Sequence, residues 1–298
     1  MLNGFGQNVK MSPLKSIDIT RSYRYTNWEI RLFEGIINML NDRDMETSLQ
    51  SRLNTKFLGR QLYYYHQLAT TMETARELVK KGAAEGAVVI AGTQTAGRGR
   101  IGRTWLSPEG SLAMSVILKP SLDNLPQLVM IASLAVVRAI KNVAGLETRI
   151  KWPNDILIKG KKVCGILIEN EVKGGRVNFA IIGIGINVNF DHLAFPEIAE
   201  IATSLSHELG TEISKIELAG TLLFELERLY LEAQAGAPVY REWQQNMETL
   251  GKQIKVKSGK TVEQGKAETV TENGNLLLRR ADGSLTEIVA GDVTVIKD

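Results

Sequence analysis

The segment Gly97–Arg103, which reads GRGRIGR, carries the clearest chemical signal in this chain. Its three glycines allow the backbone to approach a ligand closely. Its three arginines carry planar, permanently charged guanidinium groups that suit carboxylates and phosphates. Such a loop cannot bury its charges, so it makes a poor scaffold. We therefore expect it to close over an anionic ligand.

The same segment also matches G-x-G-x-x-G, the pattern of dinucleotide-binding loops. That pattern requires a helix directly after the loop, because the helix N-terminus holds the pyrophosphate. Here Pro108 and Gly110 interrupt the following residues, and a strand pattern comes next. The missing helix makes dinucleotide binding a minor alternative. A mobile surface loop is the second alternative.

A second candidate segment, Lys151–Asp155 (KWPND), leaves a predicted strand. Pro153 fixes the backbone and forces a turn, so that Asn154 and Asp155 present polar groups from a rigid scaffold. Asn and Asp also favour ordinary turns, where they cap backbone amides. The segment alone favours neither interpretation.

Glycines interrupt two further apolar strands. Lys162 begins a strand that contains Gly165, and a group approaching that glycine would lie within reach of the lysine ammonium. The segment Gly183–Asn189 (GIGINVN) repeats the pattern, and Asn187 offers both a donor and an acceptor. The alternatives are a solvated lysine at a hairpin, a β-bulge and a crowded sheet crossing. Cys164 has no partner that would make it a nucleophile.

The composition excludes several classes of protein. The 36 basic and 33 acidic side chains leave a net charge of only +3, which argues against a dedicated nucleic-acid binder. The single cysteine rules out an internal disulfide, and His66, His192 and His207 are too scattered for a metal site. No apolar run of transmembrane length and no signal peptide are recognised, which predicts a cytoplasmic protein without membrane contact.

Residues 53–250 alternate between strand and helix patterns. Strands are expected at 63–65, 87–91, 111–118, 149–152, 156–158, 163–168 and 177–186. Helices are expected from the capping box at 70–73 to Gly82, and at 128–143, 197–209, 215–233 and 238–249.

The two ends of the chain differ from this middle part. Residues 1–52 contain one clear amphipathic pattern, over 28–40, and are interpreted as an extension rather than a complete winged helix. Residues 251–298 change to strand alternation at 254–257, 263–270, 276–280 and 287–296, with glycine turns between them. This pattern predicts a small all-β barrel.

Taken together, the four segments resemble the biotin protein ligase (biotin–acetyl-CoA-carboxylase ligase) family. Gly97–Arg103 matches its GRGRxGR loop and Lys151–Asp155 its KWPND segment, while Lys162–Leu167 and Gly183–Asn187 resemble its KxxGIL and GxGxN strands. The resemblance covers roughly residues 54–298. It implies an α+β fold, with a catalytic domain (53–250) of the class II aminoacyl-tRNA synthetase and biotin ligase type. In that type a mixed β-sheet is flanked by helices, and a C-terminal SH3-like barrel (251–298) follows.

The resemblance implies that biotin and MgATP form biotinyl-5′-AMP, which then acylates one lysine of a biotin carboxyl carrier protein. Lys162 and Arg100 would lie at the biotinyl-phosphate junction, with Lys162 the main catalytic residue. Arg98 would hold the loop near the biotin carboxylate. Asp155 would assist deprotonation of the incoming lysine. No protein-bound metal is implied beyond the Mg2+ that accompanies ATP.

The resemblance also divides the remaining site residues between the two substrates. The implied biotin-binding residues are Thr70, Thr71, Gln94, Gly97, Arg98, Arg100, Lys162 and Gly165. The implied ATP-binding residues are Arg100, Arg103, Trp105, Lys151, Asn154, Asp155, Lys162 and Asn187. The chain departs from the family at Met72, where the family has a polar residue, and at Ile101, where a further basic residue is common.

Three alternatives remain open at this point. Some members of the family also bind DNA and repress the biotin operon, and the single helix pattern in residues 1–52 argues against that role here. Lipoate ligation uses a related fold and the same acyl-adenylate chemistry. A non-enzymatic biotin-binding or scaffold protein would leave the arginines and Lys162 without a catalytic role. The resemblance also implies a homodimer.

Overall fold

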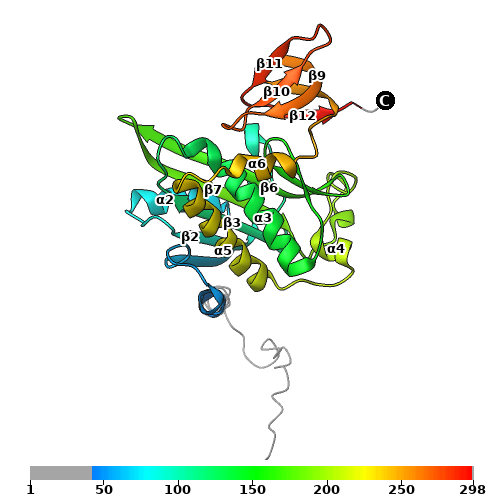
Figure 1. The fold of residues 1–298 in the computed structure, drawn as a ribbon. Coiled ribbons are helices and arrows are strands. Elements are labelled where there is room, and N and C mark those ends of the chain that lie inside the picture. Colours follow the sequence, from blue (N-terminus) through cyan, green and yellow to red (C-terminus); the bar gives the residue numbers. More distant parts are fainter. Residues whose placement is uncertain (1–41, 297–298) are drawn as a thin grey trace, which may run out of the picture. The chain divides into compact units, whose positions relative to one another are not determined.

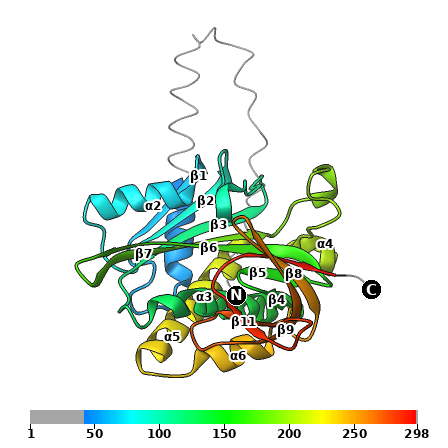
Figure 2. The same ribbon diagram turned by 90° about the horizontal axis from the view of Figure 1, so that it is seen from above.

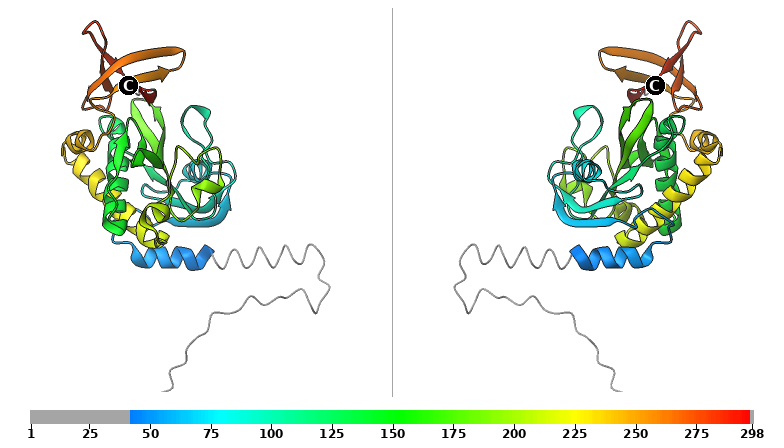
Figure 3. Two further views of the ribbon diagram at one scale, coloured as in Figure 1. Left: turned by 90° about the vertical axis from the view of Figure 1, so that its right-hand side faces the viewer. Right: turned by 90° about the vertical axis from the view of Figure 1, so that its left-hand side faces the viewer.

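The computed structural model describes residues 42–296 of the chain. The helix expected over 28–40 lies outside the described residues. Residues 42–52, which the sequence pattern did not reveal, form a helix (Figure 3). Its residue Leu49 is buried in the main hydrophobic core, and its Glu46 carboxylate accepts a hydrogen bond from the backbone of Tyr64.

A mixed seven-stranded sheet forms the centre of the structure (Figure 1). Its strand order is β1-β2-β3-β7-β6-β5-β4, and the β1–β2 pair is parallel while the other pairs are antiparallel. The strands are β1 (Leu62–Leu68), β2 (Val88–Gln94), β3 (Ser111–Leu118), β4 (Arg149–Lys151), β5 (Asp155–Ile158), β6 (Lys161–Lys173) and β7 (Arg176–Asn187). The helices are α2 (Thr71–Lys80), α3 (Leu128–Ala144), α4 (Leu205–Leu209), α5 (Lys215–Gln234) and α6 (Val239–Gln245).

Helices cover both faces of this sheet (Figure 2). Alternate side chains of a strand point to opposite faces, and the strands follow this rule. Val89 and Ile181 pack with α2 in one hydrophobic cluster. Their neighbours Val88 and Ile182 belong to the other, larger cluster, which contains α3 and α5. The expected α+β architecture is confirmed.

Helix α3 is strongly apolar. The segment Leu125–Ala144 is long and apolar enough to cross a membrane by length and composition alone, so the expectation that no run reaches that length is wrong. Ile131, Leu134 and Val136 are fully buried against the sheet and α5. The apolar character of α3 is therefore that of a core helix, hydrophobic around most of its circumference.

The helix expected over 197–209 is shorter than predicted. Only α4 forms, with the Ser204 side chain accepting a hydrogen bond from the His207 amide at its N-terminus. The residues just before α4 pair with β6 instead of forming a helix. The Lys162 amide donates to the Ile201 carbonyl, and the Thr203 amide donates to the Lys162 carbonyl. Tertiary pairing with β6 thus overrides the helical pattern. Helix α6 likewise ends earlier than the pattern over 238–249 predicted.

A second, antiparallel sheet follows α6, with strand order β11-β10-β9-β8-β12. The pattern over 287–296 predicted one strand. In the structure, residues 289–291 are not part of a strand and separate two strands, so that five strands form instead of four. Trp152 of the KWPND segment connects the two sheets, because its indole Nε1 donates to the Gly274 carbonyl at 2.9 Å. The boundary expected at residue 250 remains a prediction. The strands are β8 (Gln253–Ser258), β9 (Thr261–Val270), β10 (Leu276–Arg279), β11 (Leu285–Ile288) and β12 (Asp292–Val295).

A buried carboxylate ties α5 to the chain before β1. The Glu227 side chain accepts hydrogen bonds from the backbone amides of Lys56, Phe57 and Leu58 at 2.6, 2.8 and 2.9 Å. Glu227 is only 5% exposed. Three charge-assisted bonds satisfy amides that no strand or helix would otherwise pair.

We expect Glu227→Gln to lower the free energy of unfolding by about 1–3 kcal/mol, because a neutral amide accepts these bonds more weakly and brings an unpaired donor. Urea denaturation followed by circular dichroism measures this change. Glu232→Gln, at a partly exposed carboxylate of the same helix, should change stability by less than about 0.5 kcal/mol. Equal effects of the two substitutions would contradict the role assigned to Glu227.

Candidate active site

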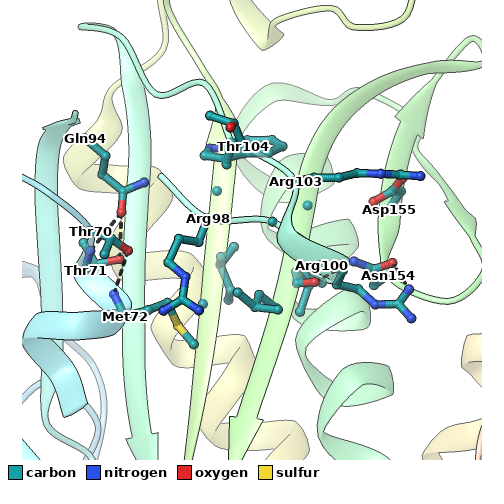
Figure 4. Close-up of a pocket in the computed structure, with 18 of the residues that line it drawn as sticks. Thr70, Thr71, Met72, Gln94, Arg98, Arg100, Arg103, Thr104, Asn154 and Asp155 are labelled. Carbon is teal, nitrogen blue, oxygen red and sulfur yellow. Dashed lines mark hydrogen bonds between the residues drawn. The ribbon is translucent and has the colours of Figure 1, made fainter. Parts of the chain in front are cut away.

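A cleft lies over β6 and β7, beside the N-terminus of α2 and the arginine-rich loop (Figure 4). Most of the residues predicted from the sequence meet there. Those that line it are Thr70, Thr71, Gln94, Arg98, Arg100, Arg103, Trp105, Asn154, Asp155, Lys162 and Gly165.

An uncharged polar cluster forms one side of the cleft. Thr70 caps α2, and its side chain accepts a hydrogen bond from the Met72 amide. The Gln94 carbonyl oxygen accepts from the Thr71 amide at 2.9 Å and from the Thr71 hydroxyl at 3.2 Å. Both threonines are buried and fixed by packing. This side can therefore hydrogen-bond a neutral polar group in a set orientation.

An ion pair occupies the floor of the cleft. Lys162 Nζ lies 2.6 Å from Asp155 Oδ1, and both side chains are partly buried. A β-bulge between β5 and β6 creates this pairing, because Ile156 pairs with Cys164 whereas Leu157 pairs with Lys162. The extra residue, Val163, turns Lys162 onto the same face as Gly165 and Asp155. Without the bulge the ammonium would point to the opposite face of the sheet.

The arginine-rich loop folds back on itself beside this ion pair. Arg100 donates to Asn154 Oδ1 at 2.9 Å, and the Asn154 amide in turn donates to the Ile166 carbonyl at 2.6 Å. Burial lowers the pKa of Arg100, and the charges of Asp292 and Asp155 oppose that effect. A guanidinium always remains charged in proteins, so Arg100 supplies a fixed positive charge next to Lys162.

Trp105 explains the glycines in the strands beneath it. A Cβ added to Gly185 would lie 2.5 Å from the indole Nε1 and Cε2 of Trp105, and one added to Gly165 would lie 3.0 Å from its Cζ3. The indole therefore rests on the backbone of β6 and β7. Lys162 Nζ is 5.4 Å from its ring centroid, a cation–π distance. The glycines in these strands predicted a close approach to the backbone, and Trp105 is the group that approaches Gly165 and Gly185.

Three of the predicted residues do not line the cleft. Gly97 lies at the base of the loop, where its carbonyl accepts from the Trp105 amide at 2.9 Å. Asn187 is buried, and its amide donates to the Thr203 carbonyl at 2.9 Å, which supports the segment paired with Lys162. Lys151 lies on β4, opposite Asp155 in the strand register.

Other residues line the cleft without a predicted role. They are Met72, Gly99, Thr104, Met114, Ile166, Leu167, Gly183, Ile184, Gly185 and Asp292. The paired glycines were a visible signal for Gly183 and Gly185. Asp292 comes from the C-terminal sheet, far from the other motifs in sequence, and no local pattern marks it. Burial raises the pKa of the Cys164 thiol, which disfavours the thiolate form that a nucleophile needs.

Two family models match this chain. The model of the biotin/lipoate A/B protein ligase family matches residues 64–187, and that of the biotin protein ligase C-terminal domain matches residues 249–295. A bifunctional ligase/repressor BirA of Bacillus subtilis is 39% identical over 254 residues, which cover 83% of this chain and 78% of the relative. A biotin–[acetyl-CoA-carboxylase] ligase of Paracoccus denitrificans is 34% identical over 72% of this chain and 94% of its own length.

Solved structures show the same fold. A biotin protein ligase from Aquifex aeolicus in complex with biotin and ATP superposes with a TM-score of 0.70 at 29% identity, covering 80% of this chain and all of the other. A biotin protein ligase from Leishmania major in complex with biotinyl-5-AMP gives a TM-score of 0.55 at 27% identity, over 78% and 99% of the two chains. Sequence, fold and cleft thus agree that this chain belongs to the biotin protein ligase family.

Proposed function

We propose that this protein is an ATP-dependent biotin protein ligase that forms biotinyl-5′-AMP and transfers biotin to a lysine of a biotin carboxyl carrier protein. The observation that carries this proposal is the pairing of Lys162 with Asp155 on the floor of a cleft. A neutral polar pocket borders that cleft on one side, and the arginine-rich loop borders it on another. The complexes of relatives with biotin and ATP support the same assignment.

In the first step a carboxylate oxygen of biotin attacks the α-phosphorus of ATP, and the bond from that phosphorus to pyrophosphate breaks. Two anions must approach each other, so the step requires fixed positive charge at the α-phosphate. Lys162 and Arg100 supply it from the cleft floor and the loop. Arg98 would face the biotin carboxylate, and Arg103 the phosphates.

The pocket formed by Thr70, Thr71 and Gln94 would hold the ureido ring of biotin, with the backbones of Gly97 and Gly165 beside it. The remaining cleft would receive the nucleotide. Trp105 would cover the ligand and pack near the nucleotide, with Asn154 and Asp155 on the nucleotide's side. Lys151 and Asn187, which do not line the cleft, would serve that side from outside its lining.

In the second step the amine of the acceptor lysine attacks the biotinyl carbonyl, an amide bond forms and AMP leaves. The amine is protonated at neutral pH and must lose a proton first. Asp155, oriented by Lys162, offers a carboxylate for that proton. Closure of the loop would exclude water from the hydrolysable anhydride.

Mg2+ would enter with the nucleotide. No group of three or more His, Cys, Asp or Glu side chains suited to a metal gathers within residues 42–296. The part of the chain described by the structure thus offers no carboxylate cage, and we assign no step to a protein-bound ion.

We also propose a cytoplasmic location and a homodimer. Sedimentation analysis of the purified protein measures the oligomeric state directly.

We expect Lys162→Ala to slow transfer of labelled biotin to a purified biotin carrier domain by about 10²–10³-fold, the loss typical of one charge-stabilising donor. The assay contains MgATP and compares wild type, Lys162→Ala and Lys161→Ala. Lys161 is the adjacent residue of β6 but does not line the cleft, so its removal should have little effect.

No labelling by the wild type would indicate that the substrate is lipoate or another acyl acid instead of biotin. Equal labelling by the wild type and Lys162→Ala would retain the ligase but remove Lys162 from its chemistry.

We expect Gly185→Ala to weaken biotin binding about tenfold, because the added methyl group displaces a rigid indole from the pocket. The matched variant is Gly183→Ala, where the methyl group meets the flexible Met72 side chain, with Sδ at 2.6 Å, and the Leu167 carbonyl lies at an ordinary contact distance of 3.5 Å. It should cost much less, because methionine adapts its shape readily. Titration calorimetry with biotin measures both. A larger effect at Gly183 would show that Trp105 does not rest on Gly185 when biotin binds.

DNA binding is a second candidate function, because the 39% identical relative is named a bifunctional ligase/repressor. The sequence pattern of residues 1–52 argued against it, and that prediction stands untested. Retention of the full chain on immobilised DNA at low salt would favour a repressor, if a chain lacking residues 1–41 passes through. Passage of both chains would support the ligase alone.

A further inference from the structure

We propose that two carboxylates outside the family motifs, Glu169 and Asp292, are positioning residues that fasten the two arms of the 97–105 loop. Glu169 holds the arm next to the biotin pocket, and Asp292 holds the arm next to the nucleotide. The assignment of the two arms to two substrates rests on the proposed function. The fastening itself rests on geometry alone.

The loop behaves as one unit because its arms are hydrogen-bonded to each other. Arg98 and Thr104 form an antiparallel bridge, the Gly99 amide donates to the Arg103 carbonyl at 2.7 Å, and the Trp105 amide donates to Gly97. Ile101 lies at the tip, 66% exposed and in the left-handed backbone region with φ 54°. Such a tip has little holding it in place. Contacts made by the arms must therefore set the position of the loop.

Glu169 of β6 contacts the first arm. Its Oε1 lies 3.6 Å from Arg98 Nη2, and its Oε2 pairs with Arg76 of α2. The Glu169 side chain is only 19% exposed, which limits screening by solvent. Helix α2 begins at Thr71, so one carboxylate links the loop to the helix that presents Thr70 and Thr71.

Asp292 of β12 contacts the second arm. Its Oδ2 lies 2.6 Å from Arg103 Nη2, and the preceding Gly291 carbonyl lies 3.5 Å from Arg100 Nη1. The turn before β12 packs closely against β8, because a Cβ added to Gly291 would lie 2.5 Å from Val256 of β8. The C-terminal sheet therefore presents Asp292 to the loop from a closely packed segment.

The charge of the two residues argues against direct contact with the anionic groups of the substrates. A carboxylate in contact with a phosphate or with the biotin carboxylate would repel it. Beside a guanidinium, the same carboxylate fixes the direction in which the arginine points its donors. Glu169 and Asp292 thus act through Arg98 and Arg103.

The test compares Glu169→Gln and Asp292→Asn with a matched control for each. The control for Glu169 is Glu171→Gln. Glu171 lies on the same strand, but its carboxylate accepts a hydrogen bond from Asn178 and does not contact the loop. Asp282→Asn alters a turn of the C-terminal sheet, where the carboxylate bonds only Ser284. Glu169→Asp and Asp292→Glu keep the charge and should restore part of each effect.

The first readout is the rate of trypsin cleavage after Arg98, Arg100 and Arg103 in the ligand-free protein, followed by mass spectrometry. We expect each neutral variant to be cleaved roughly two- to five-fold faster than wild type, the range for loss of a partly exposed ion pair. The two controls should be cleaved at the wild-type rate. Unchanged cleavage in both neutral variants would overturn the proposal. This readout requires no activity, so it decides the fastening even if the proposed function is wrong.

The second readout is biotin-dependent exchange of pyrophosphate into ATP. We expect Glu169→Gln to raise the KM for biotin several-fold and Asp292→Asn to raise the KM for ATP several-fold, with smaller changes in kcat. A fall in kcat with both KM values unchanged would indicate a general structural defect and overturn the assignment. No exchange by the wild type would count against the proposed function instead.

Discussion

The bulge at Val163 is the constraint on which the cleft depends. An unbroken β5–β6 ladder would place Lys162 and Gly165 on opposite faces, since they are three residues apart. One inserted residue brings the ammonium to the face of Asp155 and Trp105. The segment 201–203 then bonds the backbone of Lys162 on its free side, and Asn187 supports that segment from β7. The sheet thus holds a charged group where it has both a partner and access to the cleft.

The cleft combines two kinds of chemistry at a short distance. Thr70, Thr71 and Gln94 offer neutral hydrogen-bonding groups that are fixed by the N-terminus of α2. Arg100 and Lys162 offer positive charge beside them. A substrate with a neutral polar ring and a carboxylate fits such a division, and the carboxylate would meet the cations only if the ring is seated. Orientation of this kind supplies much of the barrier reduction in a reaction between two bound substrates.

The fold and the family could be predicted from the sequence because their signals are local. Strand alternation, the cap at Thr70 and the glycine turns depend on near neighbours, and the four motifs each lie within one short segment. The first part of the helix expected over 197–209 was wrong because Lys162, a distant residue, pairs with that part of the chain. The strand expected over 287–296 was wrong because alternation alone does not show a turn at residues 289–291. Asp292 could not be predicted at all, since its contact with Arg103 spans 189 positions and depends on how a second sheet packs.

The position of Trp105 has an optical consequence. The chain has four tryptophans, and two of the three in the described residues, Trp152 and Trp243, are at most 1% exposed and lie in the hydrophobic core. Trp105 instead lines the cleft, within cation–π distance of Lys162, and its indole Nε1 has no hydrogen-bond partner among the described residues. A ligand that enters the cleft changes the polarity around this one ring and leaves the two core rings as they are. The intrinsic fluorescence of the protein thus carries a built-in reporter of cleft occupancy, without any label.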